Sequence, residues 1–513
     1  MIDPITLEVA RNRLASIADE MGTVLRRTSL SPNIKERSDC SAAVFTADGQ
    51  MVAQAEHIPV HLGSMPASVL ACLDRFEPTP GSQFAVNDPF DGGTHLNDLT
   101  LVAPVFVGHT HIGWVANRAH HADVGGEAPG SMPAHATRLN QEGHVVSPTR
   151  AVQSNAWIPD FVEPFLAATR TPVERRGDLS AQIGANAVGA RRLVEVVERE
   201  GVDRYLEMTE ELLSYGERRM AAAIALLPDG VYRFEDFMEL DEVDVPIRVA
   251  VTVSGDGLIA DFSGTHSQVE SNFNAVKAVT RSCLYFALRV ATDPTIPAND
   301  GCYRLVELRT EPGSIVDALP PSAVAAGNVE TSQRISDVLL GALAQAAPER
   351  VGAAGQGTMN NVLIGSDDFA YYETVAGGQG GRPTGPGQSG IQTGMTNTEN
   401  TPIEALSTHY PFRVTRYRLR SGSGGAGLHP GGEGIEREIE FASDATLSLM
   451  GERRRNRPWG LKGGQPGAIG EDWLIKADGD RIRLRGKITL EVSGGDRLLV
   501  MTPGGGGWGS PTA

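Results

Sequence analysis

Residues 87–127 read NDPFDGGTHLNDLTLVAPVFVGHTHIGWVANRAHHADVGGE. Two apolar runs, 99–106 and 112–116, lie on either side of a short polar stretch, and such runs are typical of β-strands. If the two strands are neighbours in one sheet, the residues just before the first strand lie beside those just after the second. The stretch therefore predicts a sheet in which the side chains just before the first strand lie close to those just after the second.

Histidine and aspartate side chains occupy those strand ends. Nine of the twelve histidines lie between positions 57 and 144, where length alone would place about two. Imidazole and carboxylate together form a mixed N/O site that suits Zn, Mn or Fe. The alternative is that each is a satisfied polar residue of a loop, but burying several ionisable groups together is costly unless they share a partner. The cluster predicts a metal site that draws on His95, Asp98, His120, His121 and Asp123.

The bulk composition describes a globular protein with several domains. The chain has 513 residues, 41% hydrophobic and 21% charged, which predicts two to four domains and argues against disorder. A net charge of −18 argues against nucleic acid or an anionic membrane surface as a partner. Four widely spaced cysteines, no signal peptide and no long apolar run predict a reduced, cytoplasmic location.

Changes in pattern along the chain predict an α+β fold, with helices packed on mixed sheets and a β-rich C-terminal part. The expected domains are a metal-binding α/β domain over 1–227, a middle α/β domain over 228–400 and a β-rich domain over 401–513. The first boundary follows a helical stretch and falls at a Pro-Asp-Gly turn. The middle domain carries a glycine-rich segment, 377–394, expected to be a flexible or ligand-contacting loop.

Within the first domain the local signals are specific. Asp3 and Pro4 form a helix start, and residues 38–45 and 51–55 read as a hairpin. Residues 127–164 are rich in Pro, Gly, Ser and His, which predicts a long loop or lid. Residues 172–227 have the apolar spacing of helix.

Several familiar sites have no counterpart in the sequence. There is no P-loop and no GxSxG elbow, which argues against a P-loop NTPase and an ordinary serine hydrolase. A GxGxxG pattern begins at Gly422, but His-Pro-Gly-Gly follows it, so the helix of a dinucleotide site cannot start there. The run Arg453-Arg454-Arg455 suits either an anion clamp or a solvated basic turn.

Seven motifs together resemble the hydantoinase B family, which includes N-methylhydantoinase β subunits, the matching half of 5-oxoprolinase, caprolactamase and the α subunit of acetone carboxylase. The motifs span residues 34–509 and read IKERSDCSAAVF, VAQAEHIPVHLGSMPAS, NDPFDGGTHLNDLTLVAPVF, RAHHADVGGEAPGSMP, RRGDLSAQIGANAVGARR, MTNTENTPIEAL and TPGGGGWG.

The resemblance implies a metal-bearing subunit that works with a separate ATP-binding subunit of the hydantoinase A type. That partner would bind ATP and phosphorylate the amide oxygen of a cyclic amide, such as a hydantoin, a lactam or 5-oxoproline. This chain would then hydrolyse the activated ring with a divalent metal (Zn, Mn, Fe or Co), whose bound water has a pKa lowered toward about 7.

By the same resemblance, His95, Asp98 and His120 are the metal ligands, and an acidic ligand comes from the ERSD segment. Glu36 and Asp39 both fit that position; Asp39 is favoured because it begins the strand, and Glu36 remains as a proton acceptor. His121 and Asp123 are candidates for orienting ligands or moving protons. His57 and His61 are weaker candidates.

Three other functions compete with this hypothesis. One is a subunit of an ATP-dependent ketone carboxylase, whose known relatives are longer. Another is a non-haem Fe(II) oxygenase with two histidines and one carboxylate, although such sites usually place His and Asp two positions apart rather than three. The last is a non-catalytic scaffold for the ATP-binding partner.

Overall fold

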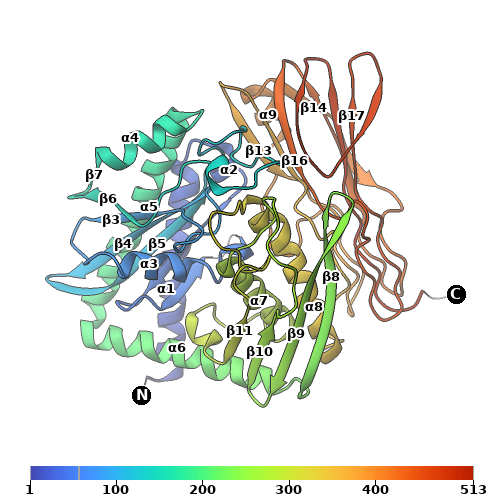
Figure 1. The fold of residues 1–513 in the computed structure, drawn as a ribbon. Helices are drawn as coiled ribbons and strands as arrows, with labels where there is room; N and C mark the ends of the chain where they lie inside the picture. The colour runs from blue at the N-terminus through green and yellow to red at the C-terminus, as the bar shows by residue number, and fades with distance from the viewer. Residues whose placement is uncertain (1, 56–57, 512–513) are drawn as a thin grey trace.

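The computed structural model describes residues 2–55 and 58–511. Along the chain an N-terminal sheet with its helices is followed by a middle region of helices and strands and then by C-terminal sheets (Figure 1). The predicted fold class, a mixed α/β chain of several domains with a β-rich end, is confirmed. Each helix in the described part of the chain is too short or too polar to cross a lipid bilayer.

The N-terminal sheet holds the strands that the sequence predicted around residues 87–127. Its order is β2-β1-β5-β4-β3-β6-β7, and every pair in it is antiparallel. The strands are β1 Cys40–Phe45, β2 Met51–Ala55, β3 Gln83–Val86, β4 Asp98–Val107, β5 Thr110–His120, β6 Thr149–Gln153 and β7 Ala156–Trp157.

Helices cover both faces of this sheet. Apolar residues of α1, α5 and α6 pack on one face, and α3 packs on the other. The helix start at Asp3 is confirmed, since its carboxylate accepts the N–H groups of Ile5 and Thr6. The helical stretch 172–227 is two helices, because Gly201 adopts φ 86° and ends the first. The helices are α1 Pro4–Thr28, α2 Pro32–Lys35, α3 Met65–Leu73, α4 Pro159–Ala168, α5 Pro172–Glu200 and α6 Val202–Ile224.

The middle region packs α8 on a four-stranded sheet of order β11-β10-β9-β8, and α7 packs against α8. Alternate residues of β9 from Val245 to Val253 are buried, as the apolar alternation in the sequence predicts. The elements are β8 Gly230–Leu240, β9 Val243–Ser254, β10 Gly257–Asp261, α7 Lys277–Ala291, β11 Val306–Arg309 and α8 Ser332–Ala346. A π-helical turn, Gly327–Thr331, directly precedes α8.

Two further sheets, of order β13-β12-β16-β19 and β14-β15-β20-β17-β18, form the C-terminal part. The first of these sheets combines strands from both sides of residue 400. Strands β12 and β13 come before that residue in the sequence, and β16 and β19 come after it. The elements are β12 Asn361–Gly365, β13 Ala370–Thr374, α9 Ile403–His409, β14 Phe412–Arg420, β15 Gly434–Phe441, β16 Ala445–Met450, β17 Glu471–Ile475, β18 Arg481–Leu484, β19 Lys487–Val492 and β20 Arg497–Met501.

Two loop predictions hold in part. Residues 127–148 are a long loop apart from a 3-10 turn at Leu139–Gln141, but residues 149–164 contain β6, β7 and the start of α4, and much of the segment is buried. The glycine-rich segment 377–394 has no helix or strand, as predicted, but its backbone is not free. Its backbone hydrogen-bonds to the C-terminal glycines, as in the 2.8 Å bond from Gly381 N to Gly506 O. A Cβ on Gly505 would lie 2.1 Å from the carbonyl oxygen of Gln379, so only glycine fits this close backbone packing.

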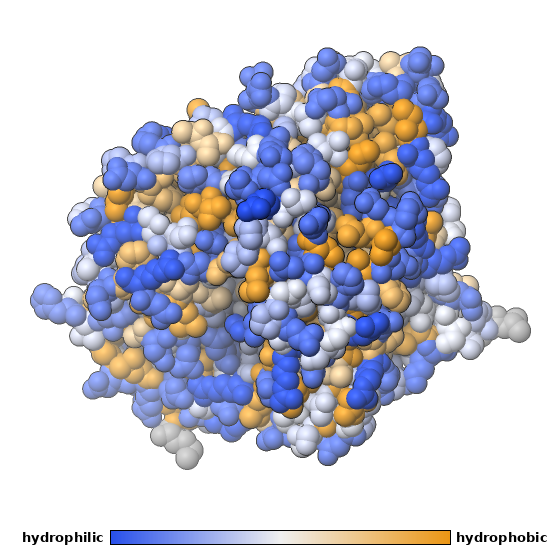
Figure 2. Space-filling view, viewed as in Figure 1, coloured by the Kyte–Doolittle hydropathy of each residue, from blue (hydrophilic) through white to orange (hydrophobic). Residues whose placement is uncertain are grey.

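The face of the protein seen in Figure 2 is mostly hydrophilic. Hydrophobic side chains appear there as patches among hydrophilic ones. Scattered apolar residues of this kind are normal on a protein surface.

Candidate metal centre

The ends of β4 and β5 bring the predicted ligands together. Asp98 is the first residue of β4 and His120 the last of β5, and the two are paired directly in the ladder. His95 comes from the turn just before β4. One ligand atom from each of the three side chains lies within 4.8 Å of the others, and all three residues are buried. The sequence prediction that these side chains converge is confirmed.

Asp98 is the centre of this cluster, because both of its oxygens are shared. Oδ1 lies 3.1 Å from Nε2 of His95 and 3.3 Å from Nδ1 of His120. Oδ2 accepts a hydrogen bond from the hydroxyl of Thr94 at 3.0 Å and lies 3.2 Å from Nε2 of His61. His61, a weaker candidate from the sequence, therefore contacts the central carboxylate directly.

The buried setting favours the protonation states that metals bind. Burial lowers the pKa of His120 to about 3, so this imidazole is neutral at pH 7. Burial by itself would raise the pKa of Asp98, but the imidazoles of His95 and His61 lower it well below its ordinary value. A neutral imidazole beside an ionised carboxylate is the ligand pair that a divalent cation requires.

Several buried polar atoms of the cluster make no hydrogen bond of good geometry. Among residues 2–55 and 58–511, this holds for Nδ1 and Nε2 of His95, Oδ1 of Asp98 and Nε2 of His120, although Oδ1 lies close to two imidazole nitrogens. Buried polar groups are rarely left unsatisfied, because each costs about 1–3 kcal/mol. A mixed N/O set with these free lone pairs fits a divalent cation.

Among the described acidic residues outside the triad, Asp39 lies nearest to the cluster. Its Oδ2 lies 3.9 Å from Nδ1 of His120, and the residue is only 5% exposed. Burial raises the pKa of Asp39 to about 7, an effect that Arg37 opposes and Asp98 reinforces. Glu36, the alternative, is half-buried at the end of α2, and no contact between it and the cluster is found in the described part of the chain. His57 lies outside the described residues.

His121 and Asp123 point to other neighbours. Nε2 of His121 lies 3.0 Å from the side-chain oxygen of Gln182 on α5, and burial lowers the pKa of His121 to about 4. Asp123 accepts backbone hydrogen bonds from Gly125 and Gly130 and pairs with Arg170 at 3.0 Å. These contacts hold the segment that follows His120, and the structure does not bring either side chain into contact with the three ligands.

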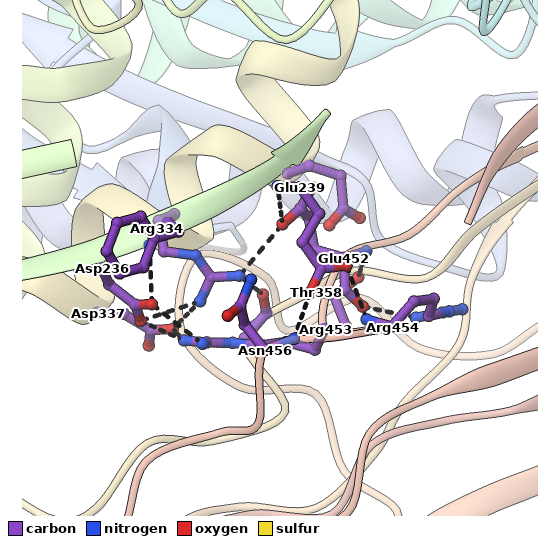
Figure 3. Close-up of polar contacts among 12 residues, drawn as sticks. Asp236, Glu239, Arg334, Asp337, Thr358, Glu452, Arg453, Arg454 and Asn456 are labelled. Atoms are coloured by element: carbon purple, nitrogen blue, oxygen red, sulfur yellow. Dashed lines mark hydrogen bonds and ion pairs between the residues drawn. The ribbon is translucent and has the colours of Figure 1, made fainter. Parts of the chain in front are cut away.

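Two arginines of the three-arginine turn, Arg453 and Arg454, are neither solvated nor free to clamp an anion, whereas Arg455 is exposed. Arg453 is 1% exposed, and its Nη2 lies 2.7 Å from Asp236 and 2.5 Å from Asp337 (Figure 3). Arg454 pairs with Asp472 at 2.9 Å. The guanidinium groups of Arg453 and Arg454 are thus paired with carboxylates of the protein itself. Through these ion pairs the turn joins the middle region to the C-terminal sheets.

Residues far from the motif were missed from the sequence. Tyr372 on β13 stacks on the imidazole of His120, with ring centroids 4.7 Å apart. Asn33 donates a hydrogen bond of 2.8 Å to the backbone oxygen of His120. No spacing signal could have identified Tyr372, because only the packing of the C-terminal sheet brings it to the cluster.

The Hydantoinase B/oxoprolinase family model matches residues 3–511. The chain belongs to this family. A protein of Methanocaldococcus jannaschii without an assigned function is 41% identical and aligns over 99% of this chain and 91% of its own length. The 5-oxoprolinase 1 of Arabidopsis thaliana is 39% identical over 99% of this chain, which spans 42% of that protein. A protein of a Pseudomonas species, named as one component of a D-/L-hydantoinase, is 31% identical, with 99% and 90% covered.

Two solved structures share the hydantoinase B fold of this chain. The ATP-dependent caprolactamase of Pseudomonas jessenii superposes with a TM-score of 0.93 at 28% identity and covers 99% of this chain and 92% of its own. An acetone carboxylase superposes with a TM-score of 0.91 at 21% identity, covering 99% and 76%. At that identity the second likeness concerns the fold alone.

Proposed function

We propose that this chain is the metal-dependent catalytic subunit of an ATP-dependent cyclic amide hydrolase. The observation that carries the proposal is the buried triad of His95, Asp98 and His120, with ligand atoms within 4.8 Å of one another. The family and the likeness to an ATP-dependent caprolactamase favour a ring amide as the substrate. Hydantoins, lactams and 5-oxoproline all belong to this class.

The three triad residues would hold the cation, and Asp39 is the acidic residue best placed to join them. A divalent cation there would act as a Lewis acid and supply a water of lowered pKa at neutral pH. His61 and Thr94 keep the carboxylate of Asp98 oriented, since each contacts its Oδ2. Burial of the whole cluster excludes bulk water, which strengthens every electrostatic interaction at the reacting bond.

The proton released in hydrolysis needs an acceptor of this chain. Asp39 is suited to that role when it is not a ligand, because its carboxylate is buried beside His120. Of the acceptors suggested by the sequence, Asp123 is already engaged by Arg170 and His121 faces Gln182. Glu36 remains a candidate only if the segment after α2 moves.

The partner in this proposal is a separate ATP-binding subunit of the hydantoinase A type, in a complex located in the cytoplasm. The sequence contains no P-loop, while the caprolactamase of similar fold is ATP-dependent. The Arabidopsis 5-oxoprolinase is more than twice as long as this chain, which leaves room in that protein for a nucleotide-binding half. All four cysteines are unpaired thiols, as expected in a reducing compartment.

Reconstitution with the partner tests the proposal. The complex should hydrolyse a cyclic amide from a panel of 5-oxoproline, hydantoins and lactams, only with ATP, and lose that activity on chelation. His95→Ala should abolish turnover while binding of the partner persists. Full activity after chelation, or in His95→Ala, would refute a metal-dependent role for this chain.

The second candidate is a ketone carboxylase subunit, which the acetone carboxylase fold favours. Supplying labelled bicarbonate and a ketone separates the two functions. Product labelling that depends on bicarbonate would replace the hydrolase by the carboxylase.

A further inference from the structure

An aromatic side chain from the C-terminal part of the chain lies directly against the metal cluster. The ring of Tyr372 and the imidazole of His120 are nearly parallel, with an interplanar angle of 15° and centroids 4.7 Å apart. Stacked rings prefer this range of distances. Tyr372 is only 3% exposed, so the side chains packed around it hold the two rings in contact. The N-terminal sheet supplies the ligand, and the C-terminal sheet supplies the surface on which it rests.

Asn33 and Arg37 close a ring of contacts with that stacked pair. Asn33 donates to the backbone oxygen of His120 at 2.8 Å, and its own side-chain oxygen accepts from Arg37 at 2.6 Å. Arg37 then donates to the backbone oxygen of Tyr372 at 2.7 Å, and its guanidinium carbon lies 4.8 Å from the Tyr372 ring centroid. Asn33 thus holds the backbone of His120 and Tyr372 holds its ring. Arg37 hydrogen-bonds to both Asn33 and Tyr372.

The tyrosine itself is anchored from the middle region. Its hydroxyl donates to Oδ1 of Asn361 at 2.8 Å, and Nδ2 of Asn361 donates to Oε1 of Glu330 at 2.7 Å. Glu330 belongs to the π-helical turn that precedes α8. Such turns occur frequently at functional sites. All three parts of the chain therefore contribute to the orientation of one imidazole.

We propose that Tyr372 and Arg37 are positioning residues for His120, so that the C-terminal sheet completes the metal site. The inference rests on the proposed metal function. An imidazole lone pair lies in the plane of the ring, so the plane of His120 decides whether its nitrogen points at the cation. Removing an orienting partner of a metal ligand typically lowers metal affinity about 10- to 100-fold.

Co²⁺ titration of the metal-free chain measures this directly, through its visible ligand-field absorption and its dissociation constant in competition with a chelator. Tyr372→Leu should weaken Co²⁺ binding about 10- to 100-fold and change the absorption band. Tyr372→Phe keeps the ring but loses the hydrogen bond to Asn361, so it should weaken Co²⁺ binding less than Tyr372→Leu does. The matched control is Tyr371→Leu. Tyr371 is equally buried, but its ring packs at a tilted angle against Tyr410 and Phe412 instead, so its loss should destabilise the sheet without changing Co²⁺ affinity.

The outcomes separate the two proposals. If wild type binds no stoichiometric Co²⁺, the metal function itself fails. If wild type binds Co²⁺ and Tyr372→Leu binds it as tightly as Tyr371→Leu does, only the positioning role is overturned. Should Tyr372→Leu not fold, Arg37→Met tests the same ring of contacts. Methionine removes both hydrogen bonds that Nη1 of Arg37 donates, to Asn33 and to Tyr372, so unchanged Co²⁺ affinity in that variant also overturns the positioning role.

Discussion

Replacing Asp98 by asparagine is the sharpest test of the metal centre. In the metal-free protein, the carboxylate is contacted by three imidazoles and the Thr94 hydroxyl. An amide offers one acceptor oxygen and an NH2 group, so at least one of these neighbours loses its partner. That loss costs about 1–3 kcal/mol, and it is partly offset because a buried charge disappears. We therefore expect a modest change in stability without metal.

The effect of added metal should be much larger. A ligand that binds only the folded protein stabilises it by about 2.7 kcal/mol at a free concentration of 100 times Kd. For a domain the size of the N-terminal region, this corresponds to a rise in Tm of about 5–10 °C. Because Asp98 is the central member of the proposed ligand triad, Asp98→Asn should show almost none of this rise at the same Zn²⁺ concentration.

Thermal unfolding of both proteins, with Zn²⁺ and with chelator, gives the four values needed. Asp123→Asn is the matched control: Asp123 is just as buried, but its carboxylate pairs with Arg170 rather than with the triad. That variant should lose stability in both conditions and keep the Zn²⁺ increment. An undiminished increment in Asp98→Asn, or its loss in Asp123→Asn, would refute the assignment of ligands.

Two further predictions concern buried charges outside the triad. Arg453→Met leaves the carboxylates of Asp236 and Asp337 with one buried arginine fewer, so urea unfolding should show a loss of about 3–5 kcal/mol. Arg455→Met, at a partly exposed ion pair, should cost less than about 1 kcal/mol; equal losses would contradict the argument. Burial raises the pKa of Glu142 to about 8 from an ordinary 4.5. The folded state therefore holds this proton more tightly than the unfolded state. The resulting stability is complete below pH 4.5 and is lost as pH rises toward 8. Relative to Glu142→Gln, wild type should lose about 1.4 kcal/mol per pH unit in that window, and parallel pH curves for the two proteins would contradict it.

For two segments, the composition of the sequence predicted looser loops than the folded chain has. Proline and glycine in residues 127–164 and 377–394 predict loops, because such composition cannot form a core of its own. In the folded chain the first segment contributes β6 and β7 to the edge of the N-terminal sheet. In the second, glycines pack backbone to backbone with the C-terminal tail, as Gly378 does with Gly505. Local composition cannot reveal partners that lie far away in the sequence, as β3 does from β6 and Gly505 from Gly378.

The sequence by itself determined the two strands and the cluster of His and Asp side chains at their ends, and the family resemblance singled out His95, Asp98 and His120 among them as the expected ligands. His95, Asp98 and His120 flank two apolar runs, and antiparallel pairing of neighbouring strands places their ends together whatever the rest of the chain does. Only the tertiary structure decided what surrounds the triad. Tyr372 reaches His120 through the docking of a distant sheet, and Asp123 is turned to Arg170 by the segment after β5. Strand pairing follows from short-range pattern, whereas these contacts depend on how separate regions pack, and no local spacing encodes that packing.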